Sequence, residues 1–171
     1  MRFLPQVGLY NRSGGRKIES GVYWTTLPDD LKVGMEAVED GKIYQLVRLS
    51  GTCCVGMVVG RYTGTALGWA TIGGATGGCK PIGISLISPT ASGAYTFVQK
   101  YGKNTSIHTS STFEAYANQT ACAWDAMYFD GRSGVVNMAN SNIGNTGRVF
   151  WLGQVLADTT TSQAVGFVNC M

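Results

Sequence analysis

The chain has 171 residues, of which 13% are charged and 24 are glycine, and its formal net charge is +3. A chain of this length can bury a core without disulfides or metals, and so small a charge does not indicate nucleic-acid binding. No stretch approaches the roughly 18 consecutive apolar residues of a membrane span, and residues 1–20 lack the pattern of a secretory signal, so we expect a soluble protein made in the cytosol that binds neither nucleic acid nor membrane.

Residues 1–28 mix large apolar side chains with polar residues and glycine, without a sustained period of 2 or 3.6 residues. They predict an extended N-terminal arm with a short strand at 21–26, followed by a single β domain at 29–171. A polar segment that carries several large apolar side chains is typical of an arm that becomes ordered on a partner. The alternative is an arm that folds back on its own domain.

The next segment predicts a turn and then a hairpin. Pro28 and the acidic residues after it favour one helical turn, and Gly34 limits its length. Asp40–Gly41 is a strong hairpin signal between apolar residues at 37–38 and the alternating run at 42–49.

From Val47 onward β-branched residues, aromatic residues and glycine dominate, which indicates an all-β domain with many turns. The nearly continuous apolar run at 53–59 suits a strand covered on both faces, and 64–78 predicts weakly specified strands. The runs at 81–87 and 94–102 flank a segment rich in Pro, Ser and Gly, and together they predict a further hairpin.

The remaining chain alternates polar and apolar segments. Residues 104–121 are the most polar. The runs at 126–129 and 135–138 flank Asp-Gly and predict a hairpin, and the runs at 148–157 and 164–168 predict a closing antiparallel pair. Together these elements predict a compact antiparallel β-barrel or β-sandwich.

Residues with catalytic potential lack the context that their chemistry requires. His108 is the one histidine, and it lies in a polar stretch without the strand–turn–helix context of a nucleophile elbow. Asp125 and Asp130 stand at opposite ends of a predicted strand and form a poor glycosidase pair. The glycine-rich residues 73–78 lack the Gly-Lys-Ser/Thr ending of a phosphate-binding loop. We therefore expect no enzyme activity, no catalytic residue and no cofactor.

The chain has five cysteines and no Cys-x-x-Cys spacing. An odd count without a secretory signal argues against a disulfide framework, and one histidine leaves a zinc site short of its usual ligands. We expect no metal site, and we expect free thiols that serve as small buried apolar groups.

Between about Val33 and Val168 the chain has four segments whose spacing and residue classes match those of a known family. They are Gly34 with the 39–44 hairpin, the aliphatic run 54–59, the 81–102 hairpin with its Ala-Tyr-Thr-Phe-Val-Gln motif, and the closing pair 153–157 and 164–168. In these patterns the chain resembles the capsid decoration, or cement, proteins of tailed phages. The cysteine content and the long aromatic arm depart from the family pattern.

The resemblance implies a β-barrel or β-sandwich bound to the exterior of an icosahedral capsid in the virion, made in the host cytoplasm. It implies a dimer or trimer that bridges neighbouring major capsid subunits, the expected protein partner. Because aromatic anchors dominate interface energies, the expected capsid contacts are the large apolar residues of the arm: Phe3, Leu4, Pro5, Tyr10, Tyr23 and Trp24.

Two other functions remain open from the sequence. A glycan- or receptor-binding fibre or knob domain would use Trp69, Tyr116 or Trp124 as stacking platforms. An enzyme would need His108 or a pair of carboxylates in a cleft.

Overall fold

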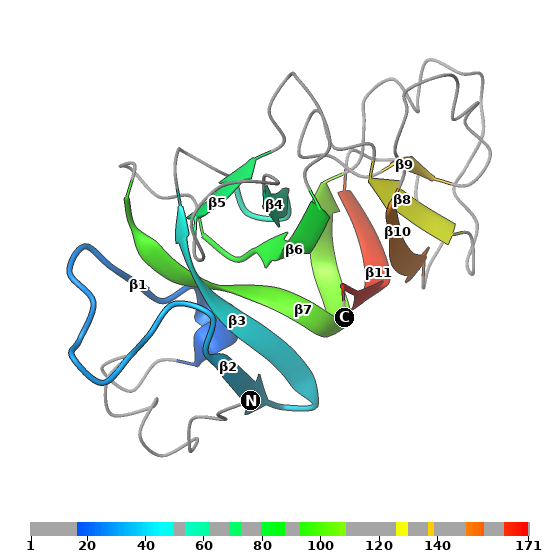
Figure 1. Cartoon of the computed structure of the whole chain (residues 1–171). Coiled ribbons are helices and arrows are strands. Elements are labelled where there is room, and N and C mark those ends of the chain that lie inside the picture. Colours follow the sequence, from blue (N-terminus) through cyan, green and yellow to red (C-terminus); the bar gives the residue numbers. More distant parts are fainter. Residues whose placement is uncertain are drawn as a thin grey trace.

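The computed structural model describes residues 17–49, 54–61, 69–72, 80–87, 93–108, 126–129, 137–138, 150–155 and 163–170. They form one 3₁₀ turn and eleven strands (Figure 1). In chain order these are η1 (Ile18–Ser20), β1 (Tyr23–Trp24), β2 (Glu36–Glu39), β3 (Lys42–Leu49), β4 (Val58–Arg61), β5 (Trp69–Ile72), β6 (Lys80–Ser85), β7 (Tyr95–His108), β8 (Ala126–Phe129), β9 (Asn137–Met138), β10 (Phe150–Val155) and β11 (Gln163–Asn169).

The strands form one sheet in the order β2–β3–β5–β4–β6–β7–β11–β10–β8–β9, with β1 beside β7. Its pairings are antiparallel except for the short parallel contact between β3 and β5. Because β7 also pairs with β3, the path β3–β5–β4–β6–β7 returns to its first strand, so the sheet curls through these five strands (Figure 1). The sheet as a whole is not closed, since β2 and the run from β11 to β9 extend from this curl. The predicted all-β class and its antiparallel pairing are confirmed.

The β2–β3 hairpin forms at the predicted position. Asp40 and Gly41 both have positive φ, of 49° and 74°, and Glu39 lies opposite Lys42. Two consecutive residues with positive φ define a type I′ turn, whose twist matches that of the flanking strands. The sequence Asp-Gly supplies the two residue types that adopt this backbone most readily.

The ribbon of β3 and β7 is buried on both faces. On its first face Tyr44, Leu46 and Phe97 pack with Ile18, Leu31 and Ala37. On its second face Val47, Leu49 and Val98 pack with Val59 inside the curl. Alternate residues of a strand point to opposite faces, so this ribbon supplies both cores of the described chain.

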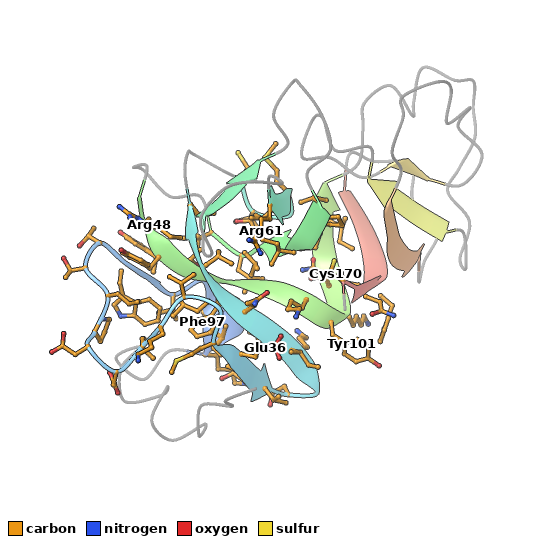
Figure 2. The ribbon with its side chains drawn as sticks, in the orientation of Figure 1. Glu36, Arg48, Arg61, Phe97, Tyr101 and Cys170 are labelled. Atoms are coloured by element: carbon orange, nitrogen blue, oxygen red, sulfur yellow. The ribbon has the colours of Figure 1, made fainter. Side chains whose placement is uncertain are left out.

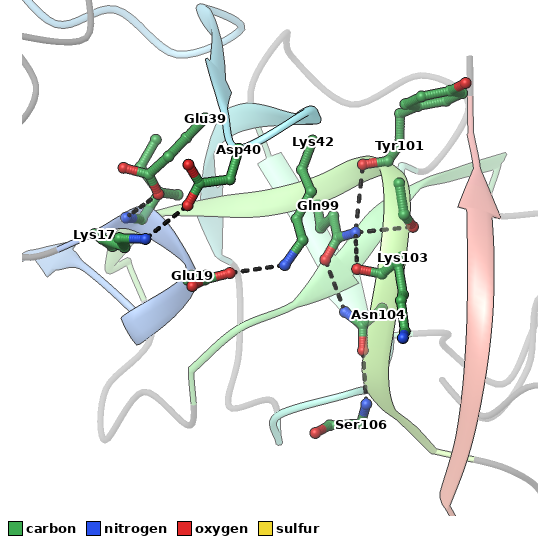
Figure 3. A network of polar contacts seen from close by, with 12 residues as sticks. Lys17, Glu19, Glu39, Asp40, Lys42, Gln99, Tyr101, Lys103, Asn104 and Ser106 are labelled. Atoms are coloured by element: carbon green, nitrogen blue, oxygen red, sulfur yellow. Dashed lines mark hydrogen bonds and ion pairs between the residues drawn. The ribbon is translucent and has the colours of Figure 1, made fainter.

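β7 changes partners near its middle, pairing with β3 up to Tyr101 and with β11 from Tyr101 onward. Gly102 allows the bend, since its φ is 105° and a Cβ there would lie 2.9 Å from Lys42 Cγ. The buried side chain of Gln99 holds the bend: its Nε2 donates to the carbonyl oxygens of Tyr101, Gly102 and Lys103 at 3.3, 3.0 and 3.1 Å (Figure 3).

A second buried amide extends this network. Asn104 Nδ2 donates to Gln99 Oε1 at 2.9 Å, and the Ser106 amide donates to Asn104 Oδ1 at 2.8 Å. Each polar atom of the two amides named here therefore has a partner at the bend, as buried polar groups require.

Other sequence predictions had mixed outcomes. β8 pairs with β9 and β10 with β11, as predicted. β6 and β7 also pair, but β1 lies beside Tyr95 and Thr96, where a regular hairpin would continue β6. The strand predicted at 53–59 starts only at Val58, because a turn precedes it: Gly56 has a φ of 86°, and the Met57 amide donates to the Cys54 carbonyl at 3.2 Å.

Candidate partner-binding surface

Residues 17–24, which we call the N-terminal strap, contain η1 and β1. Ile18 of η1 packs on the first face of the β3–β7 ribbon, and β1 pairs with the edge of β7. Tyr23 pairs with Thr96 and Trp24 with Tyr95. The Thr96 hydroxyl donates to the Val22 carbonyl at 2.8 Å. Ile18 and Val22 are buried. The described part of the predicted arm is therefore folded back on its own domain, which was the alternative expectation, and does not stand clear of it.

Charged side chains fix the start of the strap to the β2–β3 hairpin (Figure 3). Lys17 pairs with Asp40 and Lys42 with Glu19, each with a nitrogen–oxygen distance of 2.7 Å. The Ile18 amide donates to a Glu39 carboxylate oxygen at 2.8 Å. The hydrogen bond from Lys17 lowers the pKa of Asp40 and raises the pKa of Lys17 itself. These contacts fix the register of the strap on the hairpin.

The two predicted contact residues within the described chain have different environments. Trp24 packs into the first-face core, edge-on to Phe97 with 6.1 Å between ring centroids. Tyr23, its neighbour, is 53% exposed. Because adjacent strand residues point to opposite sides, Trp24 stabilises the domain while Tyr23 is presented to solvent. The other four predicted contacts, Phe3, Leu4, Pro5 and Tyr10, lie outside the described residues.

Arg48 joins an aromatic row beside the strap that the sequence did not reveal. The register places Trp24, Tyr95 and Arg48 across β1, β7 and β3. The Arg48 guanidinium lies 5.4 Å from the centroid of the Tyr95 ring, a distance typical of a cation–π contact. Figure 2 shows Arg48 at the end of the ribbon where β3 ends and β7 begins.

A second partly exposed apolar group lies at the opposite end of the ribbon. Val38, Ile43 and Tyr101 are in register across β2, β3 and β7, and Val38 is 41% exposed. Tyr101 packs edge-on against Phe167 of β11, with 4.9 Å between ring centroids. The Asp40–Gly41 hairpin sets Val38 opposite Ile43, but only the long-range pairing with β7 adds Tyr101, so the local sequence could not identify the whole group.

A partly buried ion pair and a thiol lie near this second group. Lys100 pairs with Glu36, and the Cys170 amide donates to the Lys100 carbonyl at 2.9 Å. Burial raises the pKa of the Cys170 thiol to about 12. Cys54, by contrast, is exposed, so the expectation of buried thiols is wrong at this position because Cys54 starts the turn before β4.

The residues considered for catalysis do not form a site in the described chain. His108 ends β7 opposite Gln163, whereas Asp125, Asp130 and residues 73–78 lie outside the described residues. Across the described ranges no three Asp, Glu, His or Cys side chains form a group that could hold a metal ion. None of the described helical residues forms a helix with the length and apolar character of a membrane span.

The residues considered for glycan stacking are also dispersed or undescribed. Trp69 begins β5, where it pairs with Arg48, and Tyr116 and Trp124 lie outside the described residues. Among the predicted binding residues, the exposed anchor that the structure describes is therefore Tyr23.

No protein-family model matches the chain, and no curated protein is significantly similar to it. What the protein does therefore has to be inferred from its own residues and surfaces.

Proposed function

We propose that the chain is a structural protein of a phage virion that decorates the exterior of an icosahedral capsid. In this proposal homo-oligomers bridge neighbouring major capsid subunits and no reaction is catalysed. The sequence resemblance described above gives this class of protein. The observation that carries the proposal is Tyr23, an aromatic side chain that is 53% exposed on a strap fixed to the domain.

Tyrosine is well suited to such an interface. It brings a large contact area and a hydroxyl group with few rotatable bonds. The strap already has a fixed backbone through β1, the Thr96–Val22 hydrogen bond and the Lys17–Asp40 pair. Binding therefore does not have to order this backbone, and such preorganisation reduces the entropic cost of association.

Repetition on a capsid lattice compensates for a small contact. When neighbouring copies or several sites of one oligomer bind together, each later contact forms at a high effective concentration. A surface led by one exposed aromatic residue is then sufficient for stable decoration, although the same contact would be weak for an isolated copy.

Co-sedimentation with assembled, undecorated capsids tests the proposal. We expect saturable binding of the full-length protein and at least a roughly 30-fold weaker affinity for Tyr23→Ser, the loss typical of an aromatic hot spot. Val38→Ser is the matched control, since it removes an exposed apolar side chain at the other end of the ribbon. Point substitution is preferable to deletion of residues 1–20, which would remove the buried Ile18.

Each outcome decides a part of the proposal. Loss of binding by Tyr23→Ser with retention by Val38→Ser supports a strap-led interface. Equal binding by wild type and Tyr23→Ser would overturn the role of Tyr23. Absence of saturable binding by the wild type would overturn capsid decoration, and screening against glycans would then test the fibre or knob function.

A further inference from the structure

We propose that the N-terminal strap also docks in trans, so that two copies of the chain exchange residues 17–24. Each strap then occupies on the partner copy the site that it occupies on its own domain in the structure. This inference goes beyond capsid decoration and does not depend on it. It identifies an interaction surface and a second copy of the chain as its ligand. The surface consists of the first face of the β3–β7 ribbon, the edge of β7 at Tyr95 and Thr96, and the β2–β3 hairpin.

The strap is bound to the domain mainly through contacts with residues that are distant in sequence. Apart from the two bonds that shape η1, its hydrogen bonds and ion pairs join residues far apart in the chain. The ion pairs and the Val22–Thr96 bond span 23, 23 and 74 residues. The burial of Ile18 likewise depends on Leu31, Ala37 and residues of β3 and β7. The strap's long-range contacts are all with the rest of the domain. The same contacts can therefore form with the domain of a second copy, which is the basis of domain swapping.

The charges of the strap and of the β2–β3 hairpin are complementary. The strap contributes one cation and one anion, Lys17 and Glu19, and the hairpin contributes their partners, Asp40 and Lys42. Such a pattern opposes a shifted or reversed strap, because either would bring like charges together. Another copy has the same hairpin charges and the same first-face core residues around Ile18, so a second copy is the partner that this surface fits.

A hinge follows the strap directly. Thr25 and Thr26 are exposed, and the chain contacts the first-face core again at Leu27, which packs against it, and at Leu31, which is 2% exposed. Rotation about the two threonines would redirect the strap without moving the residues after the hinge. Pro28 restricts Leu27 to extended backbone, so a helix does not continue from the strap into the hinge.

Charge reversal across the Glu19–Lys42 pair tests strap exchange. Glu19→Lys and Lys42→Glu each place like charges together when the strap docks on its own domain. When the two variants are co-expressed, exchange pairs every strap with a hairpin of opposite charge in both directions. We expect native mass spectrometry to find heterodimers in excess of the 1:2:1 statistical ratio. The matched control is the double variant Glu19→Lys/Lys42→Glu, which restores the pair within one chain and should behave as the wild type does.

A statistical ratio, or an absence of heterodimers alongside a well-folded double variant, would overturn the inference and leave the strap as an internal element. Thermal denaturation of each single variant verifies that the domain is folded. Because the experiment contains no capsids, its failure is distinguishable from a failure of the proposed function.

Discussion

Replacement of Gln99 by methionine tests whether the buried amide holds the bend in β7. Methionine has a similar length and no hydrogen-bonding amide, so the substitution removes the donor to three carbonyl oxygens and the acceptor for Asn104. Gln99 is 2% exposed, so water cannot replace these contacts freely.

The magnitude follows from the count of contacts. Two amide hydrogens serve the three carbonyls, so about three hydrogen bonds are lost, each worth ~1 kcal/mol, with a further ~1–2 kcal/mol for the buried groups left without a partner. The methionine side chain recovers ~1 kcal/mol through apolar burial. We expect a net loss of about 3–4 kcal/mol in the free energy of unfolding, or roughly 6–16 °C in Tm for a chain of this size.

Urea denaturation measures this loss, and Gln45→Met is the matched control. Gln45 is half-buried on β3, and its side chain makes a single long hydrogen bond of 3.4 Å to the Gly34 carbonyl. We expect the control to lose about 0.5 kcal/mol or less. Equal losses for the two variants would refute the reasoning, because the three-carbonyl arrangement would then contribute nothing beyond an ordinary surface contact.

Three further predictions concern single sites. Gly83→Ala should cost about 1–3 kcal/mol in urea denaturation, because its Cβ would lie 2.6 Å from the Gln99 carbonyl oxygen; an unchanged midpoint would contradict this. Burial raises the pKa of Tyr44 above the ordinary value of 10.0. The unfolded chain therefore loses this proton first, stability falls as pH rises above 10, and Tyr44→Phe should unfold at higher pH than the wild type; coincident pH profiles would exclude this contribution. Cys54 is exposed, whereas burial raises the pKa of the Cys170 thiol. Cys54→Ser should therefore remove a fast phase of labelling by Ellman's reagent, and Cys170→Ser should retain that phase. The reverse result would show that Cys170 is accessible.

Features set by a few adjacent residues could be predicted from the sequence. Asp40–Gly41 specifies its turn through the two backbone angles alone. The β10–β11 and β8–β9 pairings likewise join neighbouring apolar runs across polar connections. In these cases the local signal and the final structure depend on the same residues.

Features that depend on distant segments could not. Ile18 shows no periodic pattern, and its burial comes from Leu31 and from residues of β2, β3 and β7, which follow later in the chain. The same dependence explains why Trp24 packs into a core while Tyr23 does not. A sequence pattern identified both as large apolar residues, but only the pairing of β1 with β7 determines which of them faces solvent.

The central position of β7 has a consequence for how the chain matures on the ribosome. About 55 residues separate His108 from its partner Gln163, and at ~5–20 residues per second their synthesis takes roughly 3–11 s. During that interval the half of β7 that later pairs with β11 presents an unpaired edge, while the half that pairs with β3 already has its partner. An unpaired edge of this kind recruits other chains. The nascent protein therefore passes through a period of vulnerability to aggregation, which ends when β11 is added.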